Sequence, residues 1–243
     1  MKAIEAKKLG KRYGEIVALK ELDLDVAQGE MLALLGVNGA GKTTAIKLLS
    51  CLTAPTEGEA WLCGHSILTE AQEVKRVIGV SPQETAVAKK LSVRENLQFL
   101  AEIHGFGKQE SATRVEKMIE RMGLSEVAAR RAGTLSGGWQ RRLSIAMALI
   151  SEPQILFLDE PTLGLDVIAR HELWEQIRAL KGKTTVILTT HYLEEAETLC
   201  DRIAILAGGK LITVGTATQI KALAGKESFE DAFVALCAGG VRV

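Results

Sequence analysis

The segment GVNGAGKT, residues 36–43, has the residue types and the spacing of a phosphate-binding loop, G-x-x-x-x-G-K-S/T. It follows the apolar run 31–35 and precedes the helical pattern 45–52, so a strand, a loop and a helix are expected in that order. Backbone N–H groups in such a loop can turn inward around an anion, and the helix N-terminus adds partial positive charge. We expect Lys42 to contact the β- and γ-phosphates and the Thr43 hydroxyl to bind Mg²⁺. The alternative is a glycine turn with a surface lysine, and the flanking strand and helix count against it.

Two carboxylates end a second apolar run, ILFLDEP, at residues 155–161. A buried strand there delivers Asp159 to the C-terminal edge of a sheet, where open α/β sheets bind ligands. Asp159 is therefore predicted to hold Mg²⁺ through water, and Glu160 to act as general base or to orient the attacking water. Taken alone, a solvated strand end has the same pattern, but the phosphate loop upstream favours the functional interpretation.

A third candidate site is LSGGWQRR, residues 135–142. Ser136 is a natural helix N-cap, and Gly137 and Gly138 allow close approach of another backbone. The helix that follows presents its positive end, which suits an anion. Because residues 36–44 already serve the phosphates of the same chain, these three residues are predicted to face a nucleotide held by another subunit. A simple helix cap is the alternative.

The pattern of apolar residues predicts which elements position these motifs. Alternation at 4–8 and 17–26 indicates antiparallel strands, and further strands are expected at 31–35, 59–63, 77–80, 155–158, 184–189 and 202–206. Helices are expected near 92–105, where Ser92 and Glu95 form a capping box, and at 109–122, 136–151, 167–180, 193–199 and 229–237. Strands alternating with helices favour a parallel sheet covered on both faces. We expect one domain, with a core at 1–83 and 153–215, a helical insertion at 84–152 and a C-terminal helical tail at 216–243.

Composition limits the classes of protein. The chain has 243 residues, with 47% hydrophobic and 25% charged, as in soluble globular proteins. Lys+Arg and Asp+Glu are both 30, so no global basic field favours nucleic acid, and no nucleic-acid partner is expected. No apolar run reaches the roughly 18 residues of a membrane span, and the N-terminus lacks a signal-peptide pattern. A cytosolic protein is expected, with four cysteines that lack metal-ligand spacing and are predicted to be reduced and mostly buried.

Taken in order, the motifs resemble those of the ATPase subunit of an ATP-binding cassette (ABC) transporter. The resemblance covers nearly the whole chain. It rests on Tyr13, GVNGAGKT, Gln83 in SPQ, LSGG, ILFLDEP, GLD at 164–166 and His191 in TTHYLEEAE. It implies an α/β fold with a P-loop NTPase core, in which a mostly parallel sheet is accompanied by an antiparallel β subdomain and a helical insertion.

The resemblance also implies residue roles. Tyr13 is similar to the aromatic residue that stacks on adenine, and Gln83 to the glutamine that senses Mg²⁺ and the attacking water. Asp166 resembles the loop aspartate that crosses the dimer interface, and His191 the histidine that contacts the γ-phosphate. The expected catalytic residues are Glu160, His191, Lys42 and Gln83, and the expected Mg²⁺ residues are Thr43, Gln83 and Asp159. The expected ATP-binding residues are Tyr13, Gly36, Val37, Asn38, Gly39, Ala40, Gly41, Lys42, Thr43 and Thr44, with Ser136, Gly137 and Gly138 facing the ATP of a partner subunit.

Three segments resemble the drug-, haem- and sodium-exporter group of this family: ETAVAKKLSVRENLQF, THYLEEAETLCDRIAIL and FEDAFVALC. The resemblance implies ATP and Mg²⁺ as cofactors, a second copy closing head to tail on two ATP molecules, and a separate integral membrane permease. It also implies a cytoplasmic protein that is peripheral on the inner face of the cell membrane. Trp139 departs from the family pattern after LSGG. The alternative function is a soluble ABC ATPase not coupled to a permease, although the coiled coils or second cassette of such proteins are not seen.

Overall fold

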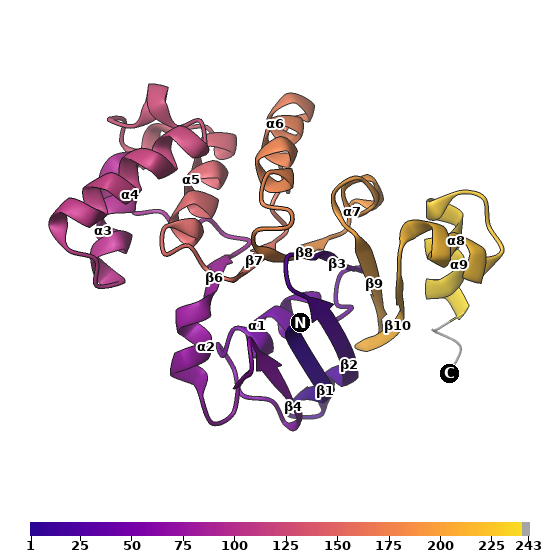
Figure 1. Cartoon of the computed structure of the whole chain (residues 1–243). Helices are drawn as coiled ribbons and strands as arrows, with labels where there is room; N and C mark the ends of the chain where they lie inside the picture. The colour runs from indigo at the N-terminus through magenta and orange to yellow at the C-terminus, as the bar shows by residue number, and fades with distance from the viewer. Residues whose placement is uncertain (240–243) are drawn as a thin grey trace.

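Two β-sheets and the helices around them make up the computed structural model, which describes residues 1–239 (Figure 1). The strands are β1 (Lys2–Tyr13), β2 (Ile16–Ala27), β3 (Met31–Leu35), β4 (Glu57–Leu62), β5 (His65–Ser66), β6 (Ile78–Ser81), β7 (Ile155–Asp159), β8 (Thr185–Thr190), β9 (Arg202–Ala207) and β10 (Lys210–Gly215). The α-helices are α1 (Lys42–Leu49), α2 (Ala71–Val77), α3 (Val93–Ile103), α4 (Lys108–Arg121), α5 (Gly137–Leu149), α6 (Val167–Arg178), α7 (Leu193–Leu199), α8 (Ala217–Ala224) and α9 (Phe229–Gly239).

The larger sheet has six strands in the order β10-β9-β3-β8-β7-β6. All of its neighbouring strands are parallel except β10, which pairs antiparallel with β9 at one edge. The smaller sheet has the order β2-β1-β4-β5 and is antiparallel throughout. The predicted parallel sheet and antiparallel subdomain are therefore confirmed. Because β3 lies between β8 and β9, the glycine-rich loop that follows β3 emerges near the centre of the larger sheet.

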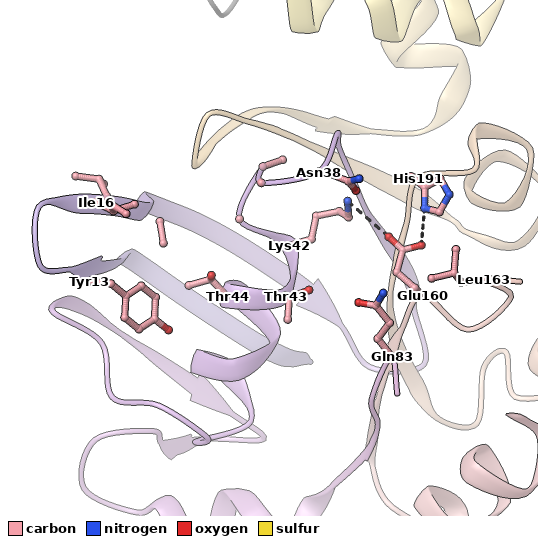
Figure 2. Close-up of a pocket in the computed structure, with 15 residues that line it drawn as sticks. Tyr13, Ile16, Asn38, Lys42, Thr43, Thr44, Gln83, Glu160, Leu163 and His191 are labelled. Atoms are coloured by element: carbon pink, nitrogen blue, oxygen red, sulfur yellow. Dashed lines mark hydrogen bonds and ion pairs between the residues drawn. The ribbon is translucent and has the colours of Figure 1, made fainter. Parts of the chain in front are cut away.

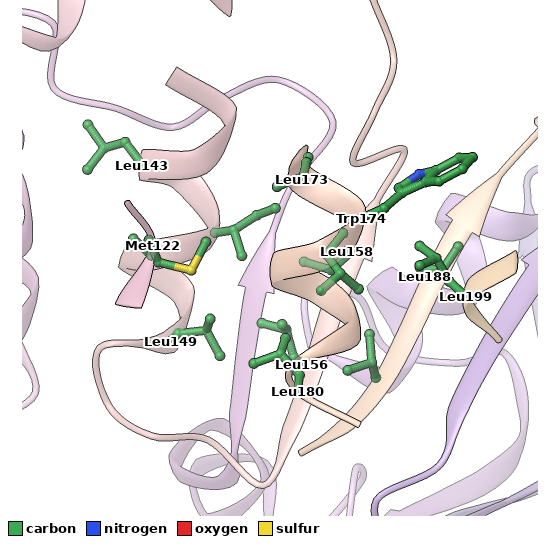
Figure 3. Close-up of a cluster of buried hydrophobic side chains, with 14 of the residues drawn as sticks. Met122, Leu143, Leu149, Leu156, Leu158, Leu173, Trp174, Leu180, Leu188 and Leu199 are labelled. Carbon is green, nitrogen blue, oxygen red and sulfur yellow. The ribbon is translucent and has the colours of Figure 1, made fainter. Parts of the chain in front are cut away.

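Two hydrophobic cores lie on opposite faces of the parallel sheet. Successive side chains of a strand point to opposite faces, and in β3 Ala33 and Leu35 enter one core while Leu32 and Leu34 enter the other. The first core packs the strands against α5, α6 and α7, with Leu156, Leu158 and Leu188 among its members (Figure 3). The second core lies between the parallel and antiparallel sheets and includes residues of α1. The apolar strand runs of the sequence thus reflect burial on both faces.

A helical lobe formed by α3, α4 and α5 lies beyond β6, away from the C-terminal helices α8 and α9 (Figure 1). The predicted capping box at the start of α3 is confirmed: Glu95 N–H donates to Ser92 Oγ at 3.2 Å, and Ser92 N–H donates to Glu95 Oε2 at 2.7 Å. The lobe shares the first core with the sheet, through residues such as Leu97, Ile119 and Leu143. It is therefore joined to the sheet by continuous packing.

The structure adds elements that the sequence pattern missed: β5, α2, β10 and α8. The strand β5 has only two residues, whereas β10 is an edge strand whose apolar residues Leu211, Ile212 and Val214 the prediction overlooked. The four cysteines are free, as predicted, and each is of intermediate burial rather than fully buried. Of the predicted tail 216–243, residues 240–243 lie outside the described part of the chain. Within the part that is described, no helix has both the length and the apolar character required to cross a membrane.

We expect Gly79→Ala to destabilise the fold. Gly79 is buried in β6, and a Cβ at this position would lie 2.2 Å from the Ala148 carbonyl oxygen of α5 and 3.0 Å from Pro153 Cγ. The helix must shift, and overpacking of this kind typically costs about 1–3 kcal/mol. Urea unfolding measures the loss. Gly137→Ala is the matched control, because a Cβ at Gly137 meets no atom within 4 Å, and equal stabilities of the two variants would contradict the prediction.

Candidate active site

A cavity of about 580 Å³ opens at the edge of the parallel sheet where its strands end (Figure 2). Parallel strands deliver their C-terminal residues to one edge, which is where α/β sheets bind ligands. Segments that follow β3, β6, β7 and β8 meet there with the β1–β2 hairpin of the smaller sheet. The lining residues are Tyr13, Ile16, Val17, Ala18, Asn38, Gly39, Ala40, Gly41, Lys42, Thr43, Thr44, Gln83, Glu160, Leu163 and His191.

The glycine-rich loop between β3 and α1 forms one wall of the cavity. Gly39 and Gly41 have φ of 82° and 102°, in the region that glycine adopts without strain. Gly41 is also the N-cap of α1, makes no side-chain cap bond and is followed by no acidic residue in the first turn. The first N–H groups of α1 therefore remain available for an anion. This is the arrangement that the sequence motif predicts.

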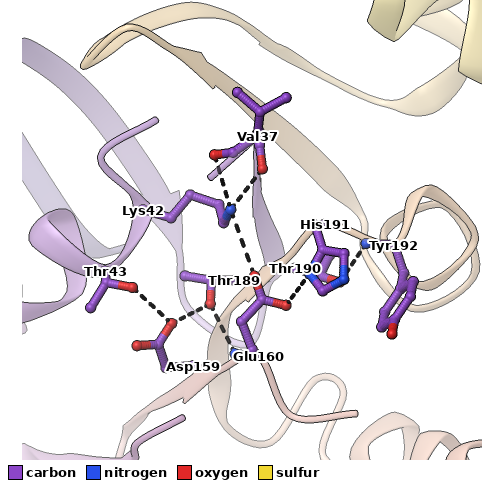
Figure 4. Close-up of polar contacts among 10 residues, drawn as sticks. Val37, Lys42, Thr43, Asp159, Glu160, Thr189, Thr190, His191 and Tyr192 are labelled. Carbon is purple, nitrogen blue, oxygen red and sulfur yellow. Dashed lines mark hydrogen bonds and ion pairs between the residues drawn. The ribbon is translucent and has the colours of Figure 1, made fainter. Parts of the chain in front are cut away.

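The buried Lys42 crosses the loop and points toward Glu160 (Figure 4). Its Nζ donates to the Gly36 carbonyl oxygen at 2.6 Å and lies 3.5 Å from that of Val37 and 3.6 Å from Glu160 Oε1. Both side chains are less than 10% exposed. The carbonyl oxygens and the carboxylate hold the Lys42 ammonium group in place. As a compact positive charge, it can contact the terminal phosphate oxygens of a bound nucleotide.

Glu160 lies between Lys42 and His191. Its second oxygen, Oε2, is 2.8 Å from His191 Nδ1, and the imidazole is one of the groups that line the cavity (Figure 2). The backbone of Glu160 has φ of 49°, which is costly for a residue with a side chain. Thr189 on β8 holds this conformation, because its Oγ1 accepts the Glu160 N–H at 2.9 Å. The carboxylate is thus fixed where it can accept a proton from water.

Asp159 and Thr43 bring oxygen atoms together below the loop. Thr43 Oγ1 lies 3.3 Å from Asp159 Oδ1, which also accepts the hydroxyl of Thr189. Mg²⁺ prefers oxygen ligands and is commonly held by one or two carboxylates together with water and phosphates. A hydroxyl, a carboxylate and the nearby Gln83 amide fit that donor set. No cluster of three or more His, Cys, Asp or Glu residues suited to a metal ion is found among residues 1–239.

Gln83 follows β6 and reaches the cavity from the side of the helical lobe (Figure 2). A residue that the sequence analysis missed holds its backbone. Arg141 of α5 donates to the carbonyl oxygens of Pro82 and Gln83 at 2.7 and 2.5 Å. Burial lowers the pKa of Arg141, while the charges of Asp159 and Glu160 act in the opposite direction. Arg141 belongs to the segment WQRR, which directly follows LSGG. Through its bonds to Pro82 and Gln83, this segment links the helical lobe to the cavity.

We expect Arg141→Lys to loosen the Gln83 segment. Lysine keeps the charge but lacks the planar fork that donates to two carbonyl oxygens. Stability should fall by about 1–3 kcal/mol, since a buried acceptor loses its partner. Displacement of Gln83 should slow ATP turnover by about tenfold. Urea unfolding and a phosphate-release assay measure the two effects, with the exposed Arg121→Lys as the matched control. Wild-type values for both quantities would contradict the prediction.

Other predicted residues lie outside the cavity lining. Gly36 and Val37 contribute carbonyl oxygens to Lys42, and Asp159 lies behind Thr43. Asp166 is the N-cap of α6 and accepts the N–H of Ala169 at 2.9 Å. Ser136, Gly137 and Gly138 begin α5 and do not line the cavity.

The start of α5 is open in the same manner as the start of α1. Ser136 is its N-cap without a side-chain cap bond, and the first turn contains no acidic residue. Ser136 and Gly137 are exposed. The neighbouring Trp139 is half-buried against the first core, and the guanidinium of Arg142 lies 4.8 Å from its ring centre. An anion could approach this helix end, but it belongs to a surface separate from the cavity.

The sequence was compared with protein families and with individual proteins. A family model described as "ABC transporter" matches residues 19–163. The "Daunorubicin resistance ATP-binding protein DrrA3" of Streptomyces coeruleorubidus is 43% identical over 221 residues, which are 90% of this chain and 70% of that protein. The "Nod factor export ATP-binding protein I" of Burkholderia thailandensis is 42% identical over 214 residues, covering 87% of this chain and 70% of that protein.

Solved structures share the fold. The "Structure of ATP binding subunit of ABC transporter" superimposes with a TM-score of 0.86 and 30% identity, over 96% of this chain and 99% of that one. The "Dimeric structure of a post-hydrolysis state of the ATP-binding cassette MJ0796 bound to ADP and Pi" has a TM-score of 0.80 and 27% identity, over 88% of this chain and 98% of that one.

Proposed function

Because the chain belongs to the ABC transporter family and is an ATP-binding and ATP-hydrolysing subunit, we propose that it powers a separate membrane permease that exports its cargo. Support for export comes from the relatives, which are described as acting in daunorubicin resistance and in Nod factor export. The cavity supports the hydrolytic role, since it brings the phosphate loop of β3 beside the carboxylate that ends β7.

The observation that carries the chemical proposal is the position of Glu160 between Lys42 and His191. ATP binds with its phosphates against the N–H groups of residues 36–44 and its adenine near Tyr13. Lys42 orients the terminal phosphates, and Glu160 accepts the proton of the attacking water. His191 fixes the Glu160 carboxylate and donates toward the γ-phosphate. Thr43, Gln83 and Asp159 are the residues that would hold Mg²⁺, which would supply charge neutralisation at the phosphates.

We further propose that two copies form each complete site. The glycine-rich loop lines the cavity, whereas the open N-terminus of α5 lies on a different surface of the same chain. A second copy placed head to tail supplies Ser136, Gly137 and Gly138 to the ATP held by the first. The solved structure of a similar ATP-binding cassette is dimeric, which supports the association of two copies. ATP then joins the two copies, and hydrolysis removes the phosphate bridge between them.

The helical insertion 84–152 is the proposed point of contact with the permease. It is linked to the site through Arg141 and the carbonyl of Gln83, so closure of the dimer moves the lobe. In this proposal the protein lies in the cytoplasm, peripheral on the inner face of the membrane, with ATP on the same side. Export rather than import rests on the relatives alone.

A tagged pull-down from detergent-solubilised native membranes, followed by mass spectrometry, tests the proposal. One multi-span protein recovered at a stoichiometric level, together with ATP hydrolysis by the complex, is the expected result. Ribosomal or DNA-repair partners without any membrane protein would instead make the chain a soluble ABC ATPase. Hydrolysis that persists in Glu160→Gln would contradict the assigned chemistry in either case.

A further inference from the structure

Glu195 of α7 is a fully buried carboxyl group that the reaction above does not use. Its exposed fraction is 0%, although acidic side chains are rarely buried completely unless they are paired. Oε1 accepts the indole N–H of Trp174 at 3.0 Å, which ties it to α6. Oε2 is enclosed by protein and completes no hydrogen bond within the described residues. Burying such a group costs stability unless it is hydrogen-bonded.

Two threonines lie next to Glu160 and His191 in the sequence, one in the loop after β7 and one at the end of β8. Thr162 is two residues after Glu160, and Thr190 directly precedes His191. Burial raises the pKa of Glu195, the charge of Glu160 acts in the same direction, and the hydroxyls of Thr190 and Thr162 lower it. Both hydroxyls therefore influence the carboxyl group, although the only hydrogen bond that its side chain completes within the described residues is the one from Trp174.

Each threonine has a hydroxyl proton available for Glu195. Thr190 Oγ1 accepts the N–H of Tyr192 at 2.9 Å, so its own proton remains free to be donated (Figure 4). Thr162 is 1% exposed, and its Oγ1 has no hydrogen-bond partner among residues 1–239. Thr162 and Glu195 thus each contribute one of the buried polar atoms that still need a partner. The structure completes no hydrogen bond between them, and a pairing of the two would satisfy both at once.

We propose that Glu195 is a positioning residue whose carboxyl group ties Thr162 to Thr190 and so holds Glu160 and His191 in contact. The inference rests on the proposed hydrolytic role of that pair. The 2.8 Å contact joins side chains from two separate loops, one after β7 and one after β8. Glu160 also has a left-handed backbone, which persists only where its surroundings fix it. Thr189 fixes the Glu160 backbone from β8, and Glu195 would add a second restraint from α7, where Trp174 anchors it to α6.

The competing explanation is that these buried groups are merely tolerated. In that case Thr162→Val, which has nearly the same shape, removes an unpaired buried hydroxyl and should leave the protein as active and at least as stable as before. The positioning role predicts a different result, because valine cannot hold the carboxyl group. The variant therefore separates the two explanations without creating a cavity.

The experiment measures steady-state ATP hydrolysis by the full chain. Thr162→Val and Glu195→Ala should lower kcat by about 10-fold to 100-fold, as expected for a small misplacement of catalytic groups, with the KM for ATP changed by less than about threefold. Glu195→Gln should keep most of the activity, since its amide oxygen can accept from Trp174 and its NH₂ group can donate to a threonine hydroxyl. Glu194→Ala is the matched control, because that side chain is exposed. If Glu195→Ala does not fold, Thr162→Val decides.

A double variant tests whether Thr162 acts through His191. Adding Thr162→Val to His191→Ala should cause no further loss, whereas fully additive losses would overturn the inference. Radiolabelled phosphate release measures the low residual rates. If the wild type hydrolyses no ATP, or Glu160→Gln hydrolyses it normally, the proposed function fails. If both behave as expected and Thr162→Val matches the wild type, only the positioning role of Glu195 is overturned.

Discussion

Glu160→Gln is expected to keep ATP binding and to lose turnover by about 100-fold or more, a typical loss when a general base is removed. Glutamine has the shape of glutamate and can still contact His191, but it cannot accept a proton from water at neutral pH. Lys42 retains its 2.6 Å bond to the Gly36 carbonyl oxygen, so the loop should keep its conformation. Phosphate release measures turnover, and a fluorescent ATP analogue measures binding.

The same variant tests the composite site. Without hydrolysis the ATP bridge persists, so light scattering should detect a dimer when ATP is added. Glu227→Gln is a matched control, because Glu227 is exposed and far along the chain in the C-terminal tail. Monomers only, at saturating ATP, would count against two copies sharing each nucleotide. A near-normal rate would show that another group accepts the proton.

Ser136→Arg is expected to abolish hydrolysis while a single chain still binds ATP. Ser136 is exposed and its side chain makes no cap bond, so arginine can be accommodated without disturbing the fold. Its bulk would, however, cover the helix N-terminus that faces the partner's ATP. Because these residues do not line the cavity of their own chain, a loss of turnover without a loss of binding must come from another copy.

The control for this variant is Ser125→Arg, an exposed serine in the same helical lobe. It should bind and hydrolyse ATP like the wild type. A mixture of Ser136→Arg with Lys42→Ala offers a stricter test, because a mixed dimer contains one site with both Lys42 and Ser136 intact. Recovery of hydrolysis on mixing supports a site shared between copies. Wild-type turnover by Ser136→Arg alone would exclude that role.

Several parts of the molecule could be predicted because they depend on neighbouring residues. The strand, loop and helix around Lys42 follow from apolar runs and from glycines that accept positive φ. The capping box at Ser92 follows from a three-residue spacing. Short or weak signals explain why β5 and α2 were missed, whereas the apolar residues of β10 were overlooked. The spacing of the four cysteines does not indicate how exposed they are.

Arg141, Thr189 and Glu195 illustrate what residue patterns could not indicate. Arg141 reaches the carbonyls of Pro82 and Gln83 only because α5 packs against β6. Thr189 meets Asp159 and the Glu160 backbone because β7 and β8 are paired in parallel. No local property of a threonine or an arginine distinguishes these positions from ordinary ones.

By itself, the sequence determined the phosphate loop, the alternation of strands and helices and the ordered motifs that resemble one family, because each depends on short-range spacing. The sequence also placed Lys42, Glu160 and His191 at one site, but only the tertiary structure decided which of their atoms are in contact and that Glu195 is buried. These contacts depend on the strand order β3-β8-β7, in which strands that are far apart in the sequence, such as β3 and β8, lie side by side in the sheet. That order results from the packing of crossover helices on both faces of the sheet, a property of the whole chain rather than of any segment.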